Sequence, residues 1–376
     1  MIISLSALVS WIAFSESKKI ETGPKELKYA AIVKEPPEKP KPPKKVFVPG
    51  NFSMDAIKKK GCVADGMLSG YGGNTEKMIK LIERSECRYL HRALETWLDE
   101  PDFEKAAEIM AEVDKPGMIF GMFIAEAIDK NKNYEDPVSG KDYDYAKMCR
   151  RYTTNTWTEG DCIPSMEKKE YRKYIKSITE RAMDIGIQSF LFGQINFQDA
   201  EYGNYSDSEL PDVIKEMKNY ARKKKLQIVI GAQTNAITDK KYLQLFDYIE
   251  GGVGIDSGGN IESGPCWSQK QSCWALLWHE QFRTKAKNVI LHLDWSGIEN
   301  DDMSKFARMD QPARIETLDN LYSYFTSRDM GFLMPLLAPL YPKNGGCYGP
   351  EKSFYSPDNR YKCRDEDAIN KILSGG

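Results

Sequence analysis

The chain has 376 residues, and its 53 basic residues nearly balance its 55 acidic ones. Nucleic-acid binding requires a strongly basic surface, so this balance argues against a nucleic-acid partner. The length left after the first fifty residues is enough for one large barrel, since such domains run to about 250 residues or more.

The N-terminal 49 residues do not have the composition of a folded domain. Ile2 to Phe14 is mainly apolar, with the length of a signal-peptide core and shorter than the roughly 20 residues that span a bilayer. We therefore expect residues 1–15 to be a signal peptide or, alternatively, a short membrane anchor, which would be the sole membrane contact. Residues 16–49 are rich in Pro, Lys and Glu and predict an extended linker. Residues 50–376 are expected to form the folded domain of an extracellular or surface-tethered monomer.

The eight cysteines fall into pairs of sequence neighbours. The expected disulfides are Cys62–Cys87, Cys149–Cys162, Cys266–Cys273 and Cys347–Cys363. Close Cys-x-x-Cys or Cys/His spacings, which metal sites need, are missing from the sequence, and there are three histidines. We therefore predict disulfides in an oxidising compartment and neither a metal nor a cofactor, with buried free thiols as the open alternative.

Apolar runs alternate with amphipathic helical stretches along the domain, which is typical of a parallel sheet. The eight expected strands are Val63–Leu68, Arg88–Leu94, Met118–Ala125, Ser189–Ile195, Gln227–Gly231, Tyr248–Gly254, Val289–Asp294 and Phe332–Leu337. The expected helices are Thr75–Arg84, Asp102–Glu112, Lys168–Met183, Ser208–Lys224, Asp239–Phe246, one from near Cys273 to about Lys285, Pro312–Ser327 and Glu366–Leu373.

Eight strand–helix units predict an α/β fold of the (β/α)8 TIM-barrel class, because this is the number at which a parallel sheet closes on itself. The alternative is an open doubly wound sheet, which often has a GxGxxG phosphate loop after its first strand. Gly70-Tyr71-Gly72-Gly73 lacks that spacing and is interpreted as a loop. Cys62 and Cys87 precede neighbouring strands and are expected at the bottom of the barrel, whereas the other three disulfides would staple loops on the top face.

Active sites of such barrels lie at the C-terminal ends of the strands, and the residues expected there are acidic, amide-bearing and aromatic. The candidates for substrate binding are Glu95, Trp97, Glu126, Gln194, Asn196, Tyr202, Gln233, Asn235, Asp256, Glu262, Trp267, Trp295 and Tyr341. Aromatic faces can stack on sugar rings while amides and carboxylates hydrogen-bond hydroxyl groups. Two carboxyl groups with different pKa values can divide the roles of acid and base.

In this respect the chain resembles the broad class of (β/α)8 glycoside hydrolases, and Asp199-Ala200-Glu201 is similar to the Asp-x-Glu pairs that several of these families carry after strand four. The resemblance is architectural and names no specific family. The chain departs from the longer chitinase signature and from the Asn-Glu pair with a strand-seven Glu. The resemblance implies a hydrolase of glycosidic bonds, and together with the expected export signal it predicts an enzyme that acts on an extracellular polysaccharide.

We assign Glu201 as the expected proton donor, Asp294 as the opposing carboxylate and Asp199 as the residue that tunes the pair. Asp294 directly follows the apolar run Val289–Leu293, so it should emerge at the top face. Asp199 could be the acid in place of Glu201. His292 has the same inward parity as Asp294 and could orient a carboxylate or be an ordinary core histidine.

Other interpretations remain open at this stage. Glu126, Asp256 and Glu262 could equally be solvated charges or helix caps. The same scaffold could serve a non-catalytic glycan-binding or surface-interaction protein, since fold does not fix function. A metal-dependent phosphodiesterase would need a His/Asp cluster, which three scattered histidines do not readily supply.

Overall fold

A parallel β-sheet runs through the centre of the domain in the computed structural model, which describes residues 45–199, 208–234, 237–262, 285–295, 299–341 and 345–375. Lys45–Gly376 form a unit of their own. The strands in spatial order are β12 (Gly331–Phe332), β11 (Val289–His292), β10 (Tyr248–Gly252), β9 (Val229–Gln233), β8 (Ser189–Phe192), β3 (Ile119–Ile124), β2 (Tyr89–Glu95), β1 (Gly61–Ala64) and β13 (Met334–Pro339). All the pairings among these strands are parallel.

The sheet closes through its last strand. β12 and β13 are two parts of one strand interrupted at Leu333, and β12 pairs with β11 while β13 pairs with β1. The Leu333 amide donates to Leu291 O at 2.8 Å, so the interruption itself remains bonded to β11. Eight parallel strands thus form a closed (β/α)8 barrel, and all eight expected strands are confirmed, with ends shifted by a few residues.

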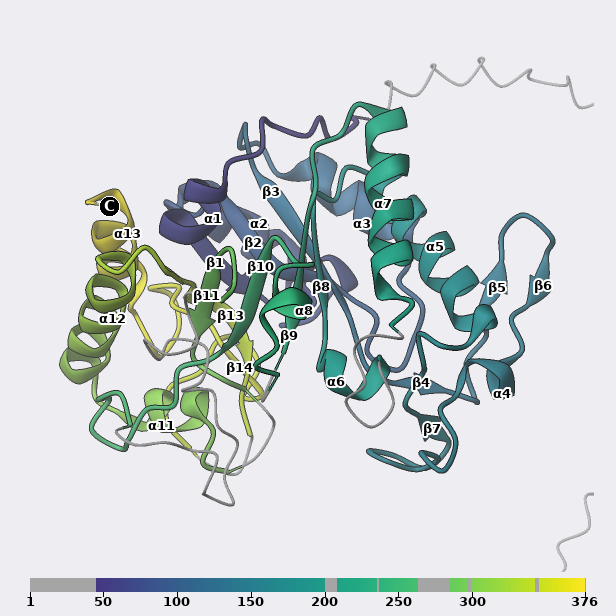
Figure 1. The fold of residues 1–376 in the computed structure, drawn as a ribbon. Coiled ribbons are helices and arrows are strands. Elements are labelled where there is room, and N and C mark those ends of the chain that lie inside the picture. Colours follow the sequence, from purple (N-terminus) through teal and green to yellow (C-terminus); the bar gives the residue numbers. More distant parts are fainter. Residues whose placement is uncertain are drawn as a thin grey trace, which may run out of the picture. The chain divides into compact units, whose positions relative to one another are not determined.

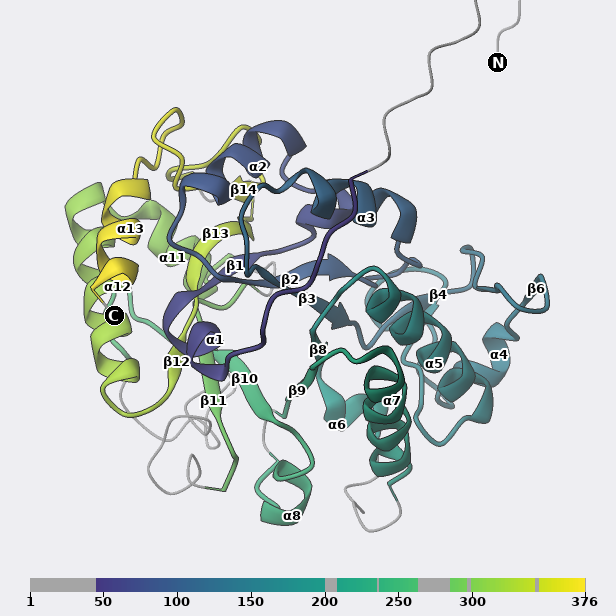
Figure 2. The same ribbon diagram turned by 90° about the horizontal axis from the view of Figure 1, so that it is seen from above.

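Helices surround the barrel (Figures 1 and 2). The helices that follow strands are α2 (Thr75–Arg84), α3 (Phe103–Glu112), α5 (Lys169–Asp184), α7 (Leu210–Lys224), α8 (Lys240–Leu243), α12 (Gln311–Thr326) and α13 (Glu366–Ser374). Asparagine and aspartate caps start several of them: Asn74 accepts from the Lys77 amide and Asp102 from the Lys105 amide. The helix expected from Cys273 to Lys285 lies outside the described residues. Within the described part, none of the helices combines the length and apolar character needed to cross a bilayer.

Several short elements were not expected from the sequence. They are α1 (Met54–Lys60), a 3-10 turn (Met67–Ser69), α4 (Tyr145–Met148), α6 (Ile195–Gln198), α11 (Asp302–Arg308), β14 (Phe354–Tyr355), and the pairs β4 (Ile128–Asp129) with β7 (Asp161–Cys162) and β5 (Glu135–Asp136) with β6 (Lys141–Asp142). Elements this short carry no readable hydrophobic period. The strand expected over Ser189–Ile195 ends at Phe192, because Gln194 adopts φ 22° and Ile195 begins α6.

Three of the four expected disulfides are confirmed, namely Cys62–Cys87, Cys149–Cys162 and Cys347–Cys363. The first joins the N-terminal end of β1 to the residues before β2, at the bottom of the barrel. The other two lie in the segments that follow β3 and β13, on the side of the strand C-terminal ends. Cys266 and Cys273 lie outside the described residues.

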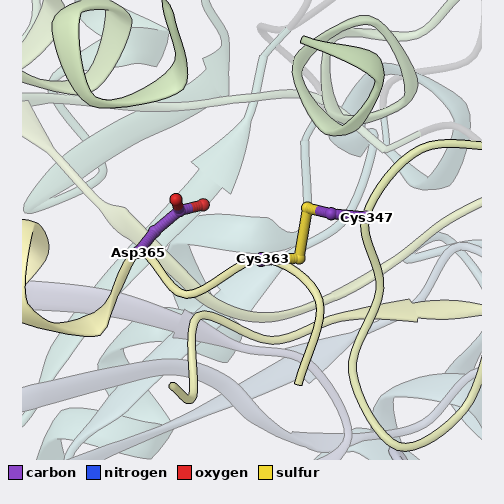
Figure 3. Close-up of side chains that lie close together, drawn as sticks. All are labelled: Cys347, Cys363 and Asp365. Carbon is purple, nitrogen blue, oxygen red and sulfur yellow. A yellow bond between two sulfur atoms is a disulfide. The ribbon is translucent and has the colours of Figure 1, made fainter. Parts of the chain in front are cut away.

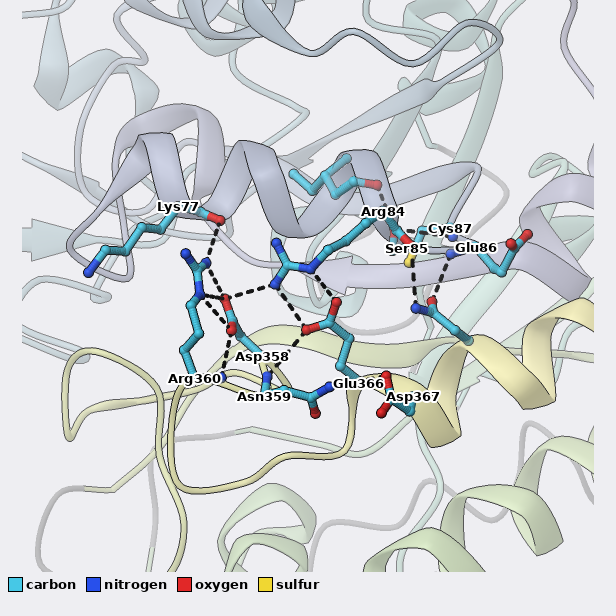
Figure 4. Close-up of polar contacts among 12 residues, drawn as sticks. Lys77, Arg84, Ser85, Glu86, Cys87, Asp358, Asn359, Arg360, Glu366 and Asp367 are labelled. Atoms are coloured by element: carbon cyan, nitrogen blue, oxygen red, sulfur yellow. Dashed lines mark hydrogen bonds and ion pairs between the residues drawn. The ribbon is translucent and has the colours of Figure 1, made fainter.

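The C-terminal segment is bound to α2 by a network of charged side chains (Figure 4). Arg84 of α2 pairs with both carboxylate oxygens of Glu366 and also with Asp358, which Arg360 approaches from the other side. Asn370 extends the contact by accepting from the Glu86 amide at 2.9 Å. Glu366 and Asp358 are nearly buried, so their charges depend on these partners.

We predict that Arg84→Ala lowers the free energy of unfolding by about 1–2 kcal/mol, because it leaves two nearly buried carboxylates short of a partner while Arg84 itself is partly solvated. Lys80→Ala is the matched control, since Lys80 lies one turn earlier on α2 in an exposed pair with Glu76. The control should leave stability unchanged. Urea unfolding measures both, and equal midpoints for the two variants would contradict the role given to this network.

Candidate active site

The interior of the barrel is polar. Tyr89 and Tyr248 reach toward each other from β2 and β10, and the Ser189 hydroxyl lies 3.0 Å from each of the two phenolic oxygens. Space for the rings comes from two glycines: a Cβ on Gly121 would lie 2.9 Å from the Tyr89 oxygen, and one on Gly231 would lie 2.2 Å from the Tyr248 ring. Glycine is therefore required at both positions by close packing.

Above these tyrosines lies the histidine–glutamate layer, which consists of His91, Glu250 and His292. All three side chains are buried. Glu250 Oε1 is 3.1 Å from His91 Nε2 and 2.5 Å from His292 Nε2. The remaining nitrogen of His91 lies 2.9 Å from the Tyr89 hydroxyl, and that of His292 lies 2.9 Å from Leu293 O.

These contacts define the proton positions. Both ring nitrogens of His292 face acceptors, a carboxylate and a carbonyl, so His292 is suited to the doubly protonated form. Burial opposes its charge, but Glu250 outweighs burial and raises the pKa of His292. For His91, burial is the dominant effect and lowers the pKa. Burial would raise the pKa of Glu250, but the charge and hydrogen bonds of the two imidazoles hold it well below its ordinary value.

Closer to the mouth lies the acid–arginine cluster of Asp65, Arg92 and Glu95. A bulge in β2 between Leu90 and Leu94, with Arg92 in the left-handed region at φ 53°, directs the arginine toward the two acids. Arg92 Nε is 2.8 Å from Glu95 Oε1 and 3.3 Å from Asp65 Oδ1. Burial, followed by the neighbouring Asp65 carboxylate, raises the pKa of Glu95 well above its ordinary value, although Arg92 opposes both.

Trp295 connects the cluster to the layer below. Its indole Nε1 donates to Asp65 Oδ2 at 2.8 Å, and its ring lies 4.4 Å from the His292 ring. The Arg92 guanidinium lies 4.8 Å from the same ring and 3.7 Å from the Phe123 ring on β3. These cation–π contacts hold the arginine between two aromatic side chains.

Glu126 lies just beyond β3 and is buried. The Gln194 side-chain amide donates to Glu126 Oε1, and the Gln194 backbone amide donates to Gln233 Oε1 at 3.2 Å. The three residues therefore link the ends of β3, β8 and β9. Glu126 Oε2 has no hydrogen-bond partner among the described residues. Burial raises the pKa of Glu126, and the charge of Glu250 adds to this effect. A hydrogen bond from the backbone of Glu126 itself, the Gln194 side chain and the charge of Arg92 oppose it. These hydrogen bonds bring together three of the expected site residues, Glu126, Gln194 and Gln233.

Asp294 follows β11 and is half buried, and its backbone amide donates to Asp302 at 3.2 Å. The strand order places β11 diametrically across the barrel from β3. Asp199 is buried and accepts from Tyr242 at 2.7 Å and from Ser208 at 2.5 Å. Because Ser208 follows residues 200–207, this last bond ties together the two ends of the segment that contains Glu201.

The remaining expected site residues lie further from these clusters or are not described. Asp256 is exposed and accepts from the Gly258 and Asn260 amides of its own turn, and Glu262 is exposed and pairs with Lys305. Trp97 packs edge-on against Trp157 at 5.6 Å. Asn196 in α6 and Tyr341 after β13 are half buried. Glu201, Tyr202, Asn235 and Trp267 lie outside the described residues, so their roles stay predictions.

The structure adds site residues that the sequence did not single out. The main ones are Tyr89, His91, Arg92, Ser189, Tyr248 and Glu250. Alternation along β2 and β10 was a usable signal, because Tyr89 and His91, and likewise Tyr248 and Glu250, are two residues apart and so face the same side of their strands. Arg92 could not have been found in this way, since the bulge breaks the alternation.

One group of possible metal ligands is present among the described residues, Cys347, Cys363 and Asp365. The two sulfurs are joined in a disulfide (Figure 3). Asp365 is paired through both oxygens with Arg314 and accepts from the Tyr355 hydroxyl at 2.9 Å. In this state the group has no thiolate to offer a metal.

Comparisons with known proteins give similarity of structure only. No protein-family model and no curated protein matches the chain. Among solved structures, a glycoside hydrolase family 5 enzyme from Prevotella bryantii matches over 87% of this chain and 99% of its own, with 10% identity and a TM-score of 0.46. A second family 5 enzyme, from Bifidobacterium longum and solved with a mannosyl–N-acetylglucosamine ligand, matches over 85% and 78%, with 10% identity and a TM-score of 0.48.

A β-L-arabinopyranosidase from Geobacillus stearothermophilus matches over 55% of this chain, with 13% identity and a TM-score of 0.31. This chain spans about half of that protein, since 53% of its length is covered.

We predict that the imidazoles of His91 and His292 titrate on opposite sides of the ordinary histidine value of about 6.5. His91 should remain neutral below that pH and His292 should remain protonated above it. The chain has three histidines, so the ring Hε1 resonances are few, and the variants His91→Gln and His292→Gln assign them. Titration of both rings near pH 6.5 would contradict the charges assigned to the layer.

The same shifts set the direction of the stability change with pH. A raised pKa makes the His292 contribution fully present below about pH 6.5 and lost as the pH rises through the folded-state value, by at most about 1.4 kcal/mol per pH unit. The lowered pKa of His91 acts in the opposite sense, because the unfolded chain gains a proton first as the pH falls. The wild-type free energy of unfolding should therefore fall as the pH rises above the folded-state pKa of His292. In urea unfolding, the His292→Gln variant should not show this fall.

Proposed function

We propose that the chain is a secreted glycoside hydrolase that acts on an extracellular polysaccharide, with Glu126 as the proton donor and Asp294 as the opposing carboxylate. The observation that carries the proposal is the state of Glu126. It is a buried carboxyl with a raised pKa and one oxygen without a partner among the described residues, at the end of the strand opposite Asp294. A general acid needs a proton at neutral pH, and a raised pKa provides it.

In the proposed reaction Glu126 transfers its proton to the glycosidic oxygen as the bond from that oxygen to the anomeric carbon breaks. Asp294 either attacks the anomeric carbon or removes a proton from the water that does so. The leaving sugar departs as a neutral alcohol that carries the proton of Glu126. If Asp294 attacks, it forms an ester with the anomeric carbon, and Glu126, now a carboxylate, removes a proton from the water that breaks this ester, so both residues return to their starting states. If Asp294 instead removes the proton from the attacking water, it then releases that proton to solvent and Glu126 takes one up from solvent. Gln194 and Gln233 position Glu126 and can hydrogen-bond sugar hydroxyls, while Arg92 keeps Asp65 and Glu95 in place.

Glu201, the donor expected from the sequence, follows β8 beside the strand that carries Glu126, and we retain it as the competing assignment. Asp199 is then a positioning residue, since it holds the ends of the segment that carries Glu201 and Tyr202. Secretion is supported by the three disulfides, because disulfides persist in oxidising compartments.

The proposal predicts that Glu126→Gln reduces hydrolysis of natural glycosidic bonds by about 10² to 10⁴, the usual range for a general acid, and spares aryl glycosides with good leaving groups. Asp294→Asn should abolish turnover on every substrate. Reducing-end release from a polysaccharide panel measures both. Glu104→Gln, an exposed carboxyl change on α3, is the control and should keep full activity.

The same assay with Glu201→Gln decides between the two donors, because the donor is the residue whose loss depends on the leaving group. Full activity in Glu126→Gln would remove Glu126 from the mechanism. A wild-type chain that binds members of the panel but hydrolyses none would instead favour the non-catalytic glycan-binding protein on the same scaffold.

A further inference from the structure

A cavity lies between the loop that follows β13 and the start of α12, lined by residues outside the candidate active site. Its volume is about 580 Å³, and it is lined mainly by Gln311, Tyr348, Arg360, Tyr361, Lys362 and Arg364. None of these residues belongs to the candidate active site. Because the loop follows the C-terminal end of a strand, the cavity is at the same end of the barrel as the mouth.

The cavity carries an excess of positive charge. Arg360 is neutralised by Asp358, but Lys362 and Arg364 have no carboxylate partner among the described residues. The acid next to Arg364 in sequence, Asp365, is turned inward and is bound by Arg314. Two cations therefore line the cavity without a carboxylate partner in the part of the chain that the structure describes.

Aromatic groups accompany these cations. Lys362 Nζ lies 4.3 Å from the Tyr348 ring, and its hydrogen bond and charge lower the pKa of the Tyr348 hydroxyl. The hydroxyl oxygen of Tyr361 is buried and has no hydrogen-bond partner among the described residues. The wall thus offers two aromatic side chains, Tyr348 and Tyr361, beside two cations that lack a carboxylate partner among the described residues.

The backbone of this wall is held in place before any ligand binds. The Cys347–Cys363 disulfide closes the loop (Figure 3). Arg314 donates to Cys363 O at 2.7 Å. Gln311 donates to Arg364 O, and Arg364 adopts the left-handed φ of 60°. A preorganised site loses less entropy on binding than a free loop does.

We propose that this cavity binds an acidic saccharide through a carboxylate or sulfate group. Lys362 and Arg364 would bind the anion, and Tyr348 and Tyr361 would contact the sugar ring. The anionic part of this inference rests on the unpaired cations, and the saccharide part rests on the proposed function. The site would hold a charged polysaccharide beside the mouth without taking part in bond cleavage.

Calorimetry with four probes tests this inference: polygalacturonate for carboxylate, dextran sulfate for sulfate, neutral dextran and inorganic phosphate. The wild-type chain should bind at least one acidic polymer tenfold or more tightly than dextran, and binding should weaken with added salt. The double variant Lys362→Gln/Arg364→Gln should lose at least tenfold of that affinity. Lys215→Gln/Lys223→Gln removes two exposed charges from α7 and should bind like the wild type.

Several results would overturn the inference. These are unchanged binding in the Lys362/Arg364 variant, an equal loss in the α7 control, or phosphate binding as tight as polymer binding through the same two residues. Lys362→Gln alone, at an exposed position, repeats the test should the double variant unfold. The proposed function can fail independently of this site. If the chain binds acidic polymer through these residues but hydrolyses nothing, the anion site is supported and the hydrolase activity is not.

Discussion

The buried charge of Glu250 determines which side chains can occupy the interior of the barrel. A carboxylate at the centre of a barrel is costly unless it is paired, and here two imidazoles from β2 and β11 pair with it. His91 in turn requires the tyrosine–serine chain below, and that chain requires glycine at 121 and 231. His292 contacts Trp295, which holds Asp65 at the mouth. The side chains at the mouth are thus held in place by a continuous set of polar contacts inside the barrel.

Much of the fold could be predicted from the sequence, since the period of strand, loop and helix is long and repeated. Short elements such as α6 could not, because the backbone of Gln194 ends β8 earlier than its apolar run does. For the candidate site, Glu95, Glu126, Gln194, Gln233 and Trp295 were expected from their positions at strand ends, and the structure places them in the clusters described above. Arg92 and Glu250 were not, because a bulge hides the orientation of the first and burial inside the barrel hides the partners of the second.

Among the described residues of the mouth, Arg92 is paired with two acids, Asp65 and Glu95. Burial raises the pKa of both Glu95 and Glu126, so these two carboxyls keep their protons at a pH where exposed glutamates have lost theirs. Glu95 is bound by Arg92 through both oxygens, which suits a structural role, whereas Glu126 has one oxygen left for a substrate. Trp295 is buried beneath this cluster, and its indole Nε1 donates a hydrogen bond to Asp65.

Glu250 and His292 are expected to act as one charged unit inside the barrel. A double-mutant cycle of Glu250→Gln, His292→Gln and the double variant, followed by urea unfolding, measures how far each side chain depends on the other. Each single variant should lose about 3–5 kcal/mol of unfolding free energy, and the double variant should lose much less than the sum of the two. Additive losses would show that the two side chains are independent and that no such unit exists.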